Sequence, residues 1–318
     1  MILVCGEALI DFFPPAAEGG GTLEFSGRAG GSPFNVAVGL ARLGIPAAFY
    51  SSLSTDLFGT ALRQTLLDEG VDLSLVCMSR QPSTLAFVQT GPDANPRYAF
   101  MGDNAADRQV SVETLPASLP DDIRALSFGS FSLAVEPCGT AYETLMRREA
   151  PHRVIALDPN VRSSLIPDME KYRQRLERLV GLSNIVKVST EDLCELYGAD
   201  TNITDVGGRW FQHGPSLVVI TDGAKGVHVL LDGKRTFFPA RTVVVTDTVG
   251  AGDSFHAALL AGLYRTGYLT QDAFPSLRHE ELAPVIEQAI AAASVTCTRQ
   301  GADLPYLIDL FPQENGLT

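Results

Sequence analysis

Short runs of hydrophobic residues alternate along the chain with longer stretches in which hydrophobic residues recur at helical spacing. The short runs are aliphatic or β-branched with almost no polar alternation, which predicts strands buried on both faces of a sheet. We expect strands at residues 2–5, 47–51, 126–129, 154–157, 185–188 and 217–220. We expect helices at residues 33–43, 57–69, 139–149, 170–182, 191–197, 205–213, 253–264 and 280–298. This order predicts an α/β fold with a mostly parallel central sheet and helices on both faces, in which ligands bind at the carboxyl ends of the strands.

Two segments depart from this rhythm. Residues 14–26 are rich in Gly and Pro and end in an alternating stretch, and residues 84–101 alternate as well. Alternation predicts strands with one solvated face, which we interpret as a small β lid formed by segments 12–26 and 84–105. Two surface hairpins without function are the alternative, and the exposed edges of a lid would also allow a homodimer. We find no internal repeat or linker, so we expect a single domain over residues 1–318.

The composition of the chain argues against several classes of binding partner. The 318 residues include 24 Lys and Arg against 37 Asp and Glu, a net charge of −13, whereas non-specific nucleic-acid binding needs a basic surface. Five widely spaced cysteines without a C-x-x-C pair favour free thiols over disulfides or a zinc site. The N-terminus lacks a basic leader, and no uncharged apolar run reaches the roughly 18 residues of a membrane span. We therefore expect a cytoplasmic protein without a membrane or nucleic-acid partner.

The stretch Asp247-Thr-Val-Gly-Ala-Gly-Asp253 carries the most chemical information. It follows an expected strand at residues 242–246 and opens a helix, and Gly250 and Gly252 allow a tight turn close to a ligand. The first N–H groups of a helix lack internal partners and the helix dipole adds positive potential, so the turn suits a phosphate. A carboxylate at its mouth, Asp253, can accept the proton of a hydroxyl group that attacks phosphorus. The alternative is that Asp253 only caps the helix.

Other nucleotide and nucleophile motifs are absent from the sequence. There is no G-x-x-x-x-G-K-[ST], no G-x-G-x-x-G after the first strand and no G-x-S-x-G. These absences count against a P-loop enzyme, a dinucleotide-dependent dehydrogenase and an α/β-hydrolase, respectively. His256 follows Asp253 closely, but we interpret it as a residue on a helix face rather than as a catalytic base.

The ordered motifs resemble those of the ribokinase-like (PfkB) family of sugar and nucleoside kinases over nearly the whole chain. The N-terminal signature reads Gly30-Gly31-Ser-Pro-Phe-Asn35-Val-Ala, and the C-terminal signature is the stretch that ends in Asp253. Each signature alone is moderately specific, and the two at this separation make chance improbable. The resemblance implies a ribokinase-like fold with a β lid, a small-molecule sugar as acceptor, ATP and Mg²⁺ as cofactors, and K⁺ in many members.

The resemblance also implies roles for matched positions. Catalysis would fall to the base Asp253 and to the N–H groups of Gly250, Ala251 and Gly252. The sugar would be bound by Asp11, Gly30, Gly31 and Asn35. The nucleotide would contact the turn that contains Thr221, Gly223, Lys225 and Gly226. A monovalent cation would be held by oxygens of Asp247, Val249, Thr296 and Gly301.

The magnesium position departs from the family pattern. The family's Asn-x-x-Glu motif, which is tied to magnesium and phosphate, falls on Ser189-Thr-Glu191-Asp192. Asp192 can replace the Glu of the motif and Glu191 is adjacent, but Ser189 stands where Asn is usual. The resemblance therefore implies a magnesium site at Asp192 or Glu191 without the usual Asn.

Two further features resemble the fructokinase branch. In Asp158-Pro-Asn160-Val-Arg162, the Asn and Arg would face the ATP phosphates, and a guanidinium can bond phosphate oxygens in a bidentate way. We place Asn160 with the nucleotide-binding residues and Arg162 with the substrate-binding residues. Lys187 also resembles that branch and would offer a point charge to phosphate. Surface ion pairs are the alternative for Arg162 and Lys187.

The second lid segment helps to choose among sugars. The stretch Arg97-Tyr-Ala-Phe100-Met is similar to fructokinase lids, so we count Phe100 among the substrate-binding residues, with plain lid packing as the alternative. The Tyr-Tyr-Arg pattern of 2-keto-3-deoxygluconate kinases is missing. The sequence favours an ATP-dependent fructokinase. Ribokinase, 2-keto-3-deoxygluconate kinase, nucleoside kinase and a non-catalytic sugar-binding regulator are the alternatives.

Overall fold

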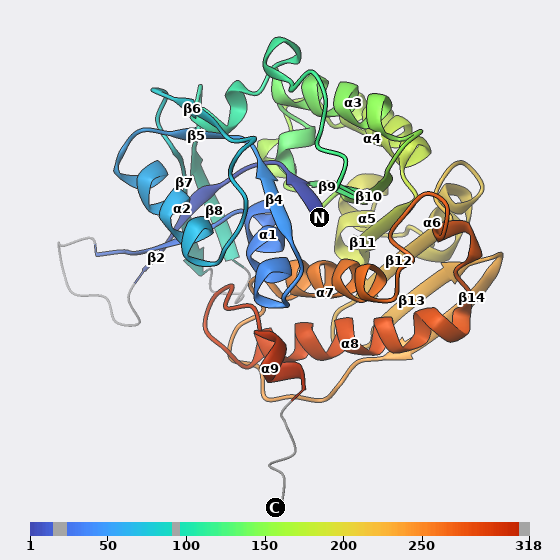
Figure 1. Ribbon diagram of the computed structural model, residues 1–318. Helices are drawn as coiled ribbons and strands as arrows, with labels where there is room; N and C mark the ends of the chain where they lie inside the picture. The colour runs from blue at the N-terminus through green and yellow to red at the C-terminus, as the bar shows by residue number, and fades with distance from the viewer. Residues whose placement is uncertain (15–23, 91–95, 312–318) are drawn as a thin grey trace, which may run out of the picture.

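An eight-stranded sheet forms the centre of the protein (Figure 1). The computed structural model describes residues 1–14, 24–90 and 96–311. Six neighbouring strands run parallel, and the last two form an antiparallel hairpin at one edge. In spatial order the strands are β14 (Lys234–Pro239), β13 (Gly226–Leu231), β12 (Leu217–Asp222), β11 (Ile185–Ser189), β10 (Val154–Asp158), β9 (Ala125–Gly129), β1 (Ile2–Cys5) and β4 (Ala47–Tyr50).

Helices cover both faces of this sheet. Because side chains alternate along a strand, Ile2 and Val4 belong to one apolar cluster, whereas Leu3 and Cys5 belong to the other. The first cluster includes residues of α1 (Ser32–Arg42), α2 (Leu57–Asp68), α7 (Ala251–Arg265) and α8 (His279–Cys297). The second includes residues of α3 (Cys138–Glu149), α4 (Met169–Leu182), α5 (Thr190–Tyr197) and α6 (Ile203–Phe211). The predicted α/β architecture with a mostly parallel sheet is confirmed.

Shorter elements complete the described chain. A short helix α9 (Leu307–Leu310) follows α8, and 3-10 turns lie at Ala106–Gln109, Val112–Thr114, Phe131–Leu133, Ser163–Leu165 and Phe274–Ser276. The strands β5 (Ser52–Ser54) and β6 (Cys77–Ser79) form a two-stranded sheet. Within the described ranges, no helix has the length and apolar character needed to cross a membrane.

A second, four-stranded sheet lies beside the central one (Figure 1). Its order is β3 (Ser26–Gly30), β2 (Leu9–Phe13), β7 (Thr84–Thr90) and β8 (Pro96–Met101). The strands β7 and β8 fall within the predicted lid segment 84–105, whereas β2 and β3 overlap the predicted segment 12–26 only at its two ends. Residues 15–23 and 91–95 of the predicted lid lie outside the described part. Since β2 follows β1 after only three residues, the small sheet is anchored at the carboxyl end of a central strand.

One predicted strand is wrong. Residues 242–246 form a loop and pair with no strand of the described structure. The three consecutive valines suggested a strand, but strand preference reflects packing on a pleated, half-buried surface, and the edge of the sheet is already taken by β13 and β14. The loop is fastened instead to the end of α8, because the N–H groups of Thr246 and Asp247 both donate to the Cys297 carbonyl. Val244 is consequently 88% exposed.

Candidate active site

A cavity of about 1040 Å³ opens at the carboxyl ends of the parallel strands, where ligands of such sheets bind. Its walls come from the β1–β2 connection, the start of α1, the ends of β10, β11 and β12, loop 240–250 and the start of α7. Most of the residues singled out from the sequence line it. The exceptions are Gly30, Lys225, Asp247, Thr296 and Gly301.

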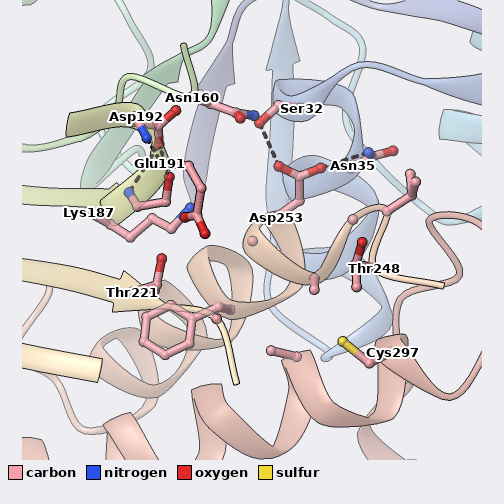
Figure 2. Close-up of a pocket in the computed structure, with 18 of the residues that line it drawn as sticks. Ser32, Asn35, Asn160, Lys187, Glu191, Asp192, Thr221, Thr248, Asp253 and Cys297 are labelled. Carbon is pink, nitrogen blue, oxygen red and sulfur yellow. Dashed lines mark hydrogen bonds between the residues drawn. The ribbon is translucent and has the colours of Figure 1, made fainter. Parts of the chain in front are cut away.

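Asp253 is the third residue of α7 and is only 7% exposed. Figure 2 shows its carboxylate between two side chains of α1: Ser32 Oγ donates to Oδ1 at 2.6 Å, and Asn35 Nδ2 donates to Oδ2 at 2.8 Å. Ser32 and Asn35 are three residues apart, so both lie on one face of the helix. Both oxygens of Asp253 therefore accept from α1 rather than from the N–H groups of its own helix, and the carboxylate lines the cavity.

The turn before α7 brings backbone N–H groups to the same place. Gly250 is left-handed, with φ of 78°, which a glycine adopts readily. Gly252 is the second residue of α7, a position whose N–H has no partner within the helix. Ala251 N–H already donates to the Thr248 carbonyl, over a long 3.2 Å. The Gly250 and Gly252 groups are thus the stronger candidates to bind an anion.

A buried ion pair places the ammonium group of Lys187 beside this turn. Lys187 Nζ donates to Asp158 Oδ2 at 2.8 Å, and both side chains are 4% exposed. A Cβ at Gly252 would lie only 3.1 Å from Nζ, so the glycine allows this close approach. Burial raises the pKa of Asp158 to about 6 against the attraction of Lys187. Burial opposes the charge of Lys187, yet the carboxylates around it, led by Asp158, raise its pKa. Lys187 is therefore charged at neutral pH.

The predicted sugar floor gathers around Asp11 on β2. Burial raises the pKa of Asp11 to about 7, Arg162 opposes this rise, and Asp253 adds to it. A Cβ at Gly30 would lie 2.3 Å from Asp11 Oδ2, so only a glycine leaves room for this carboxylate. Gly31 has φ of 102°, a conformation that side chains disfavour. Phe100 on β8 lines the same cavity, with its ring 6.1 Å from that of Phe131.

The loop after β10 is tied to the start of α5 by Asp192. Its Oδ1 accepts from Val161 N at 2.7 Å, and its Oδ2 accepts from Ser189 N and Ser189 Oγ at 3.0 and 2.7 Å. Ser189 thus caps α5, where the family pattern has Asn. Arg162 lines the cavity, with Nη1 2.8 Å from Asn160 Oδ1. Both oxygens of Asp192 are engaged, so Glu191, which is exposed and also lines the cavity, is the more available carboxylate.

The turn after β12 lines the far end of the cavity. Thr221, Gly223 and Gly226 contribute to the lining, whereas Lys225 points away and pairs with Asp222 Oδ2 at 3.1 Å. Its side chain is 77% exposed. The structure therefore places the backbone of this turn, rather than the Lys225 side chain, at the site.

The candidates for a monovalent cation are only partly brought together. Asp247 Oδ1 accepts from Val249 N at 3.1 Å, and Oδ2 accepts from Gly301 N at 2.8 Å. These bonds join the turn before α7 to the turn after α8. Thr296 is fully buried between α7 and α8, where its hydroxyl donates to Ser254 Oγ at 2.9 Å. Among the residues that the structure describes, no group of three or more His, Cys, Asp or Glu side chains is arranged to hold a metal ion.

Sequence reasoning missed two polar residues at this site. Ser32 lies within the Gly-Gly-Ser signature, and its place at a helix start was the available signal. Glu7 is the second residue after β1 and lines the cavity, and Ser132 Oγ donates to its Oε2 at 2.5 Å. Burial raises the pKa of Glu7 to about 7.

His256, which the sequence places close to Asp253, is fully buried. It lies 2.9 Å from Ser127 Oγ, and burial lowers its pKa to about 3. It stays neutral and out of reach of a ligand in the cavity.

Comparison with known proteins places this geometry in a family. The family described as pfkB family carbohydrate kinase matches residues 1–308. A fructokinase from Rhizobium leguminosarum bv. trifolii is 42% identical over 282 residues, which cover 89% of this chain and 85% of the relative. The crystal structure of a fructokinase from Xylella fastidiosa with bound ATP matches with a TM-score of 0.89 and 28% identity, covering 98% of this chain and 97% of that one.

A third relative shows a ligand set. A fructokinase double mutant from Vibrio cholerae O395, crystallised with fructose, ADP and potassium, matches with a TM-score of 0.84 and 26% identity. The match covers 98% of this chain and 97% of that one. Sequence and fold therefore both match carbohydrate kinases over nearly the full length of the chain. The chain belongs to the pfkB family of carbohydrate kinases, phosphotransferases that use an alcohol group as acceptor.

Proposed function

We propose that this kinase is an ATP-dependent fructokinase, which transfers the γ-phosphoryl group of ATP to a primary hydroxyl group of fructose. The observation that carries the proposal is the position of Asp253, which lines the cavity beside the first N–H groups of α7. The fructokinases similar to this chain in sequence and in fold support fructose as the acceptor.

Transfer would proceed in line between the sugar oxygen and the leaving oxygen of ADP. Asp253 accepts the proton of the sugar hydroxyl as that oxygen attacks phosphorus. The N–H groups of Gly250 and Gly252 and the ammonium group of Lys187 lie beside the start of the same helix. They stabilise the negative charge of the transferring group.

At the sugar end, Asp11 and Asn35 bond hydroxyl groups of the ring, and the glycines at positions 30 and 31 admit the ring against the backbone. Phe100 covers the sugar from the small sheet, which we propose to act as a lid. Closure of such a lid excludes water, which otherwise competes as the phosphoryl acceptor. Arg162 lies close enough to Asp11 to act on its charge, so it faces the junction between sugar and phosphate.

The residues present fit a magnesium ion that is shared with nucleotide phosphates. Mg²⁺ needs only one or two protein carboxylates when phosphates and water complete its shell, and Glu191 offers a carboxylate on the cavity wall. Asp192 would act mainly by holding the neighbouring loop. A bound magnesium ion would offset phosphate charge during transfer.

Other assignments from the sequence remain part of this proposal. Asp247, Val249, Thr296 and Gly301 remain the proposed potassium site. The proposal is supported by the potassium-bound relative and by the proximity of three of these residues, since Asp247 accepts from Val249 N and Gly301 N. Five free cysteines in the described chain are consistent with a reducing cytoplasm. A homodimer through the small sheet and a single domain over the whole chain also remain predictions.

A panel of acceptors tests the proposal. ADP release is measured in a coupled assay at fixed ATP and Mg²⁺, with and without K⁺, for fructose, ribose, 2-keto-3-deoxygluconate and nucleosides. We expect fructose to give the highest kcat/KM, and K⁺ to raise turnover if the four cation positions are assigned correctly. A kcat/KM for fructose far below that of another acceptor would assign the enzyme to that substrate instead.

A further inference from the structure

Ser32 contacts the proposed base but has no role in the scheme above. It opens α1 directly after Gly31, and its half-buried side chain lines the cavity. The 2.6 Å between its Oγ and Oδ1 of Asp253 is typical of a hydrogen bond to a charged oxygen. Because a carboxylate only accepts, the Ser32 hydroxyl donates. Ser32 therefore makes with Asp253 the same bond that an acceptor alcohol must make before transfer.

The two oxygens of Asp253 differ in their surroundings. The bond from Asn35 to Oδ2 is buried, and Asn35 itself is 7% exposed, so this amide anchors one side of the carboxylate. The bond from Ser32 to Oδ1 is only partly buried. Oδ1 is therefore the oxygen that an entering hydroxyl group can reach, and Ser32 is the group that it meets there.

Water competes with the sugar as the acceptor of the phosphoryl group. If Asp253 took a proton from water, the water oxygen would bond to the γ-phosphorus, the bond to the ADP oxygen would break, and ATP would be hydrolysed. A sugar held by Asp11 and Asn35 brings its hydroxyl group to Oδ1 already oriented. A free water molecule lacks these contacts with the protein. To reach Oδ1 of Asp253 it would have to displace the hydroxyl group of Ser32, which α1 holds in place.

We propose that Ser32 is a positioning residue that reserves Asp253 for alcohol acceptors and keeps it from activating water. The inference rests on the proposed role of Asp253 as the base. It goes further in naming what sets the preference for a sugar hydroxyl over water: a tethered serine hydroxyl on Oδ1 that only a firmly bound acceptor replaces.

The test compares two rates in the same preparations of full-length enzyme. One is ADP release without sugar, and the other is ADP release with the sugar that the panel above ranks first, both with ATP and Mg²⁺. In Ser32→Ala we expect the ratio of sugar-free to sugar-dependent turnover to rise about tenfold, the size expected for loss of a hydrogen bond to a charged group. Ser32→Thr keeps the hydroxyl group, so its ratio should stay close to that of the wild type.

The ratio separates this role from a structural one, because a loss of folded protein lowers both rates by the same factor. Ser276→Ala removes an exposed hydroxyl group remote from the cavity and should change neither rate. Ser32→Gly repeats the test if the alanine variant folds poorly. An unchanged or lower ratio in the Ala and Gly variants would overturn the role of Ser32. Near-normal turnover in Asp253→Asn would instead overturn the base itself, and the two failures are thus distinguishable.

Discussion

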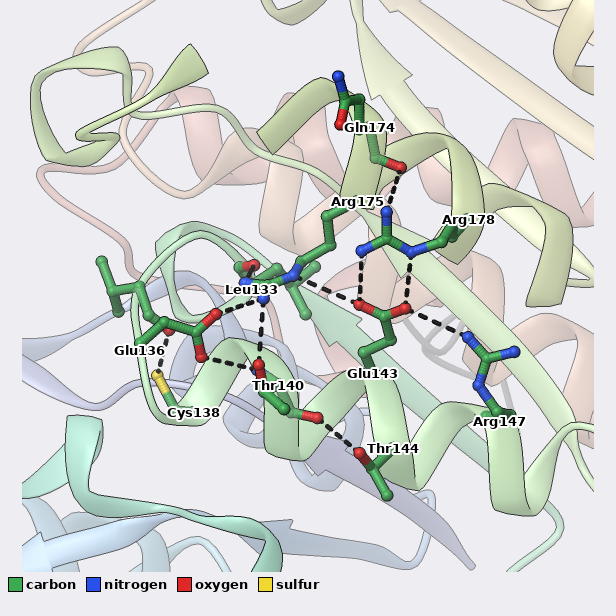
Figure 3. Close-up of polar contacts among 11 residues, drawn as sticks. Leu133, Glu136, Cys138, Thr140, Glu143, Thr144, Arg147, Gln174, Arg175 and Arg178 are labelled. Atoms are coloured by element: carbon green, nitrogen blue, oxygen red, sulfur yellow. Dashed lines mark hydrogen bonds and ion pairs between the residues drawn. The ribbon is translucent and has the colours of Figure 1, made fainter. Parts of the chain in front are cut away.

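Carboxyl groups in the cleft differ in their surroundings from those on the surface where α3 packs against α4. The surface groups are paired with arginines, whereas those in the cleft are mostly buried beside neutral groups. On the surface, Glu143 of α3 is bonded by Arg178 of α4 at 2.8 and 3.0 Å and is paired with Arg147 and Arg175 (Figure 3). The bond from Arg178, aided by the other guanidinium groups, lowers the pKa of Glu143 below its ordinary value. In the cleft, burial raises the pKa of Asp11 to about 7, and the electrostatic attraction of Arg162 does not offset this rise.

The difference shows what each region is built for. On the surface, several cations neutralise one carboxylate, and water screens the exposed guanidinium groups of Arg147 and Arg178, so their ion pairs contribute little to stability. In the cleft, carboxylates are held mostly by neutral donors and by burial, and the buried ammonium group of Lys187 is paired with Asp158. Groups that are desolvated and incompletely neutralised can respond to a ligand, and such groups gather at functional sites.

The largest effect is expected from removal of the base. Asp253→Asn keeps the shape of the side chain and one accepting oxygen, and so can keep one of the two bonds donated by Ser32 and Asn35, but it cannot take the sugar proton. We expect kcat to fall by about 10³-fold, the usual contribution of a positioned general base, with the KM values for sugar and ATP retained. Steady-state kinetics check this, with Glu143→Gln as the surface control of unchanged kcat. Turnover of Asp253→Asn within tenfold of the wild type would contradict the assignment.

The next effect is on stability and compares two cations. Lys187→Met leaves Asp158 buried without its partner, which we expect to lower the free energy of unfolding by about 3–5 kcal/mol. Arg178→Ala removes a half-exposed partner of Glu143 and should cost about 0–1 kcal/mol. Urea denaturation of the two variants measures the difference. An equal decrease in the free energy of unfolding of the two variants would mean that the buried pair is no more sensitive to loss of its cation than the surface cluster.

The smallest effect is a pH dependence of opposite sign in the two regions. The folded protein holds a proton on Asp11 up to a pKa of about 7, whereas the unfolded chain releases it near 3.8. The contribution of Asp11 to stability therefore falls as pH rises from about 4 to 7. Asp11→Asn should be more stable than the wild type at pH 8, and this gain should shrink toward pH 4.

Glu143 provides the matched comparison. Because its folded-state pKa is lowered from 4.5, its stabilising contribution is present at neutral pH and is lost as pH falls through the lowered value. Glu143→Gln should therefore be less stable than the wild type at pH 7, by less than about 1 kcal/mol, and the deficit should disappear near pH 3. Thermal melts at pH 4, 6 and 8 with a further point at pH 3 measure both trends. The same sign in both variants would refute the contrast.

Much of the architecture was predictable because it rests on local patterns. Uninterrupted apolar runs identified the parallel strands, since strands covered on both faces have no solvated side. The valine-rich residues 242–246 were misassigned for the same reason: apolarity alone does not tell a strand from a loop that closes a cavity. The hairpin of β13 and β14 was missed, although positions in β13 alternate between buried and half-buried, as in antiparallel strands with one solvated face.

At the site, the order of motifs identified the residue types but not all of the contacts. Asp253 and Asn35 were found through their signatures, whereas the bond from Ser32 to Asp253 joins residues 221 positions apart and depends on how α1 packs against α7. Lys225 illustrates the reverse case. Its place in a nucleotide-contacting turn was predicted, but its side chain pairs with Asp222 on the solvent side.

The amino-acid sequence by itself determined the α/β class, the glycine turn before α7 and the presence of an acid at its mouth, because these depend on short-range periodicity and backbone conformation. Only the tertiary structure decided which charges are buried, which are paired and which face the cavity. Desolvation and hydrogen bonding depend on neighbours brought in from distant parts of the chain. A carboxyl group is therefore neutralised by arginines on the surface, as at Glu143, whereas in the cleft, as at Asp11, it remains able to respond to a ligand.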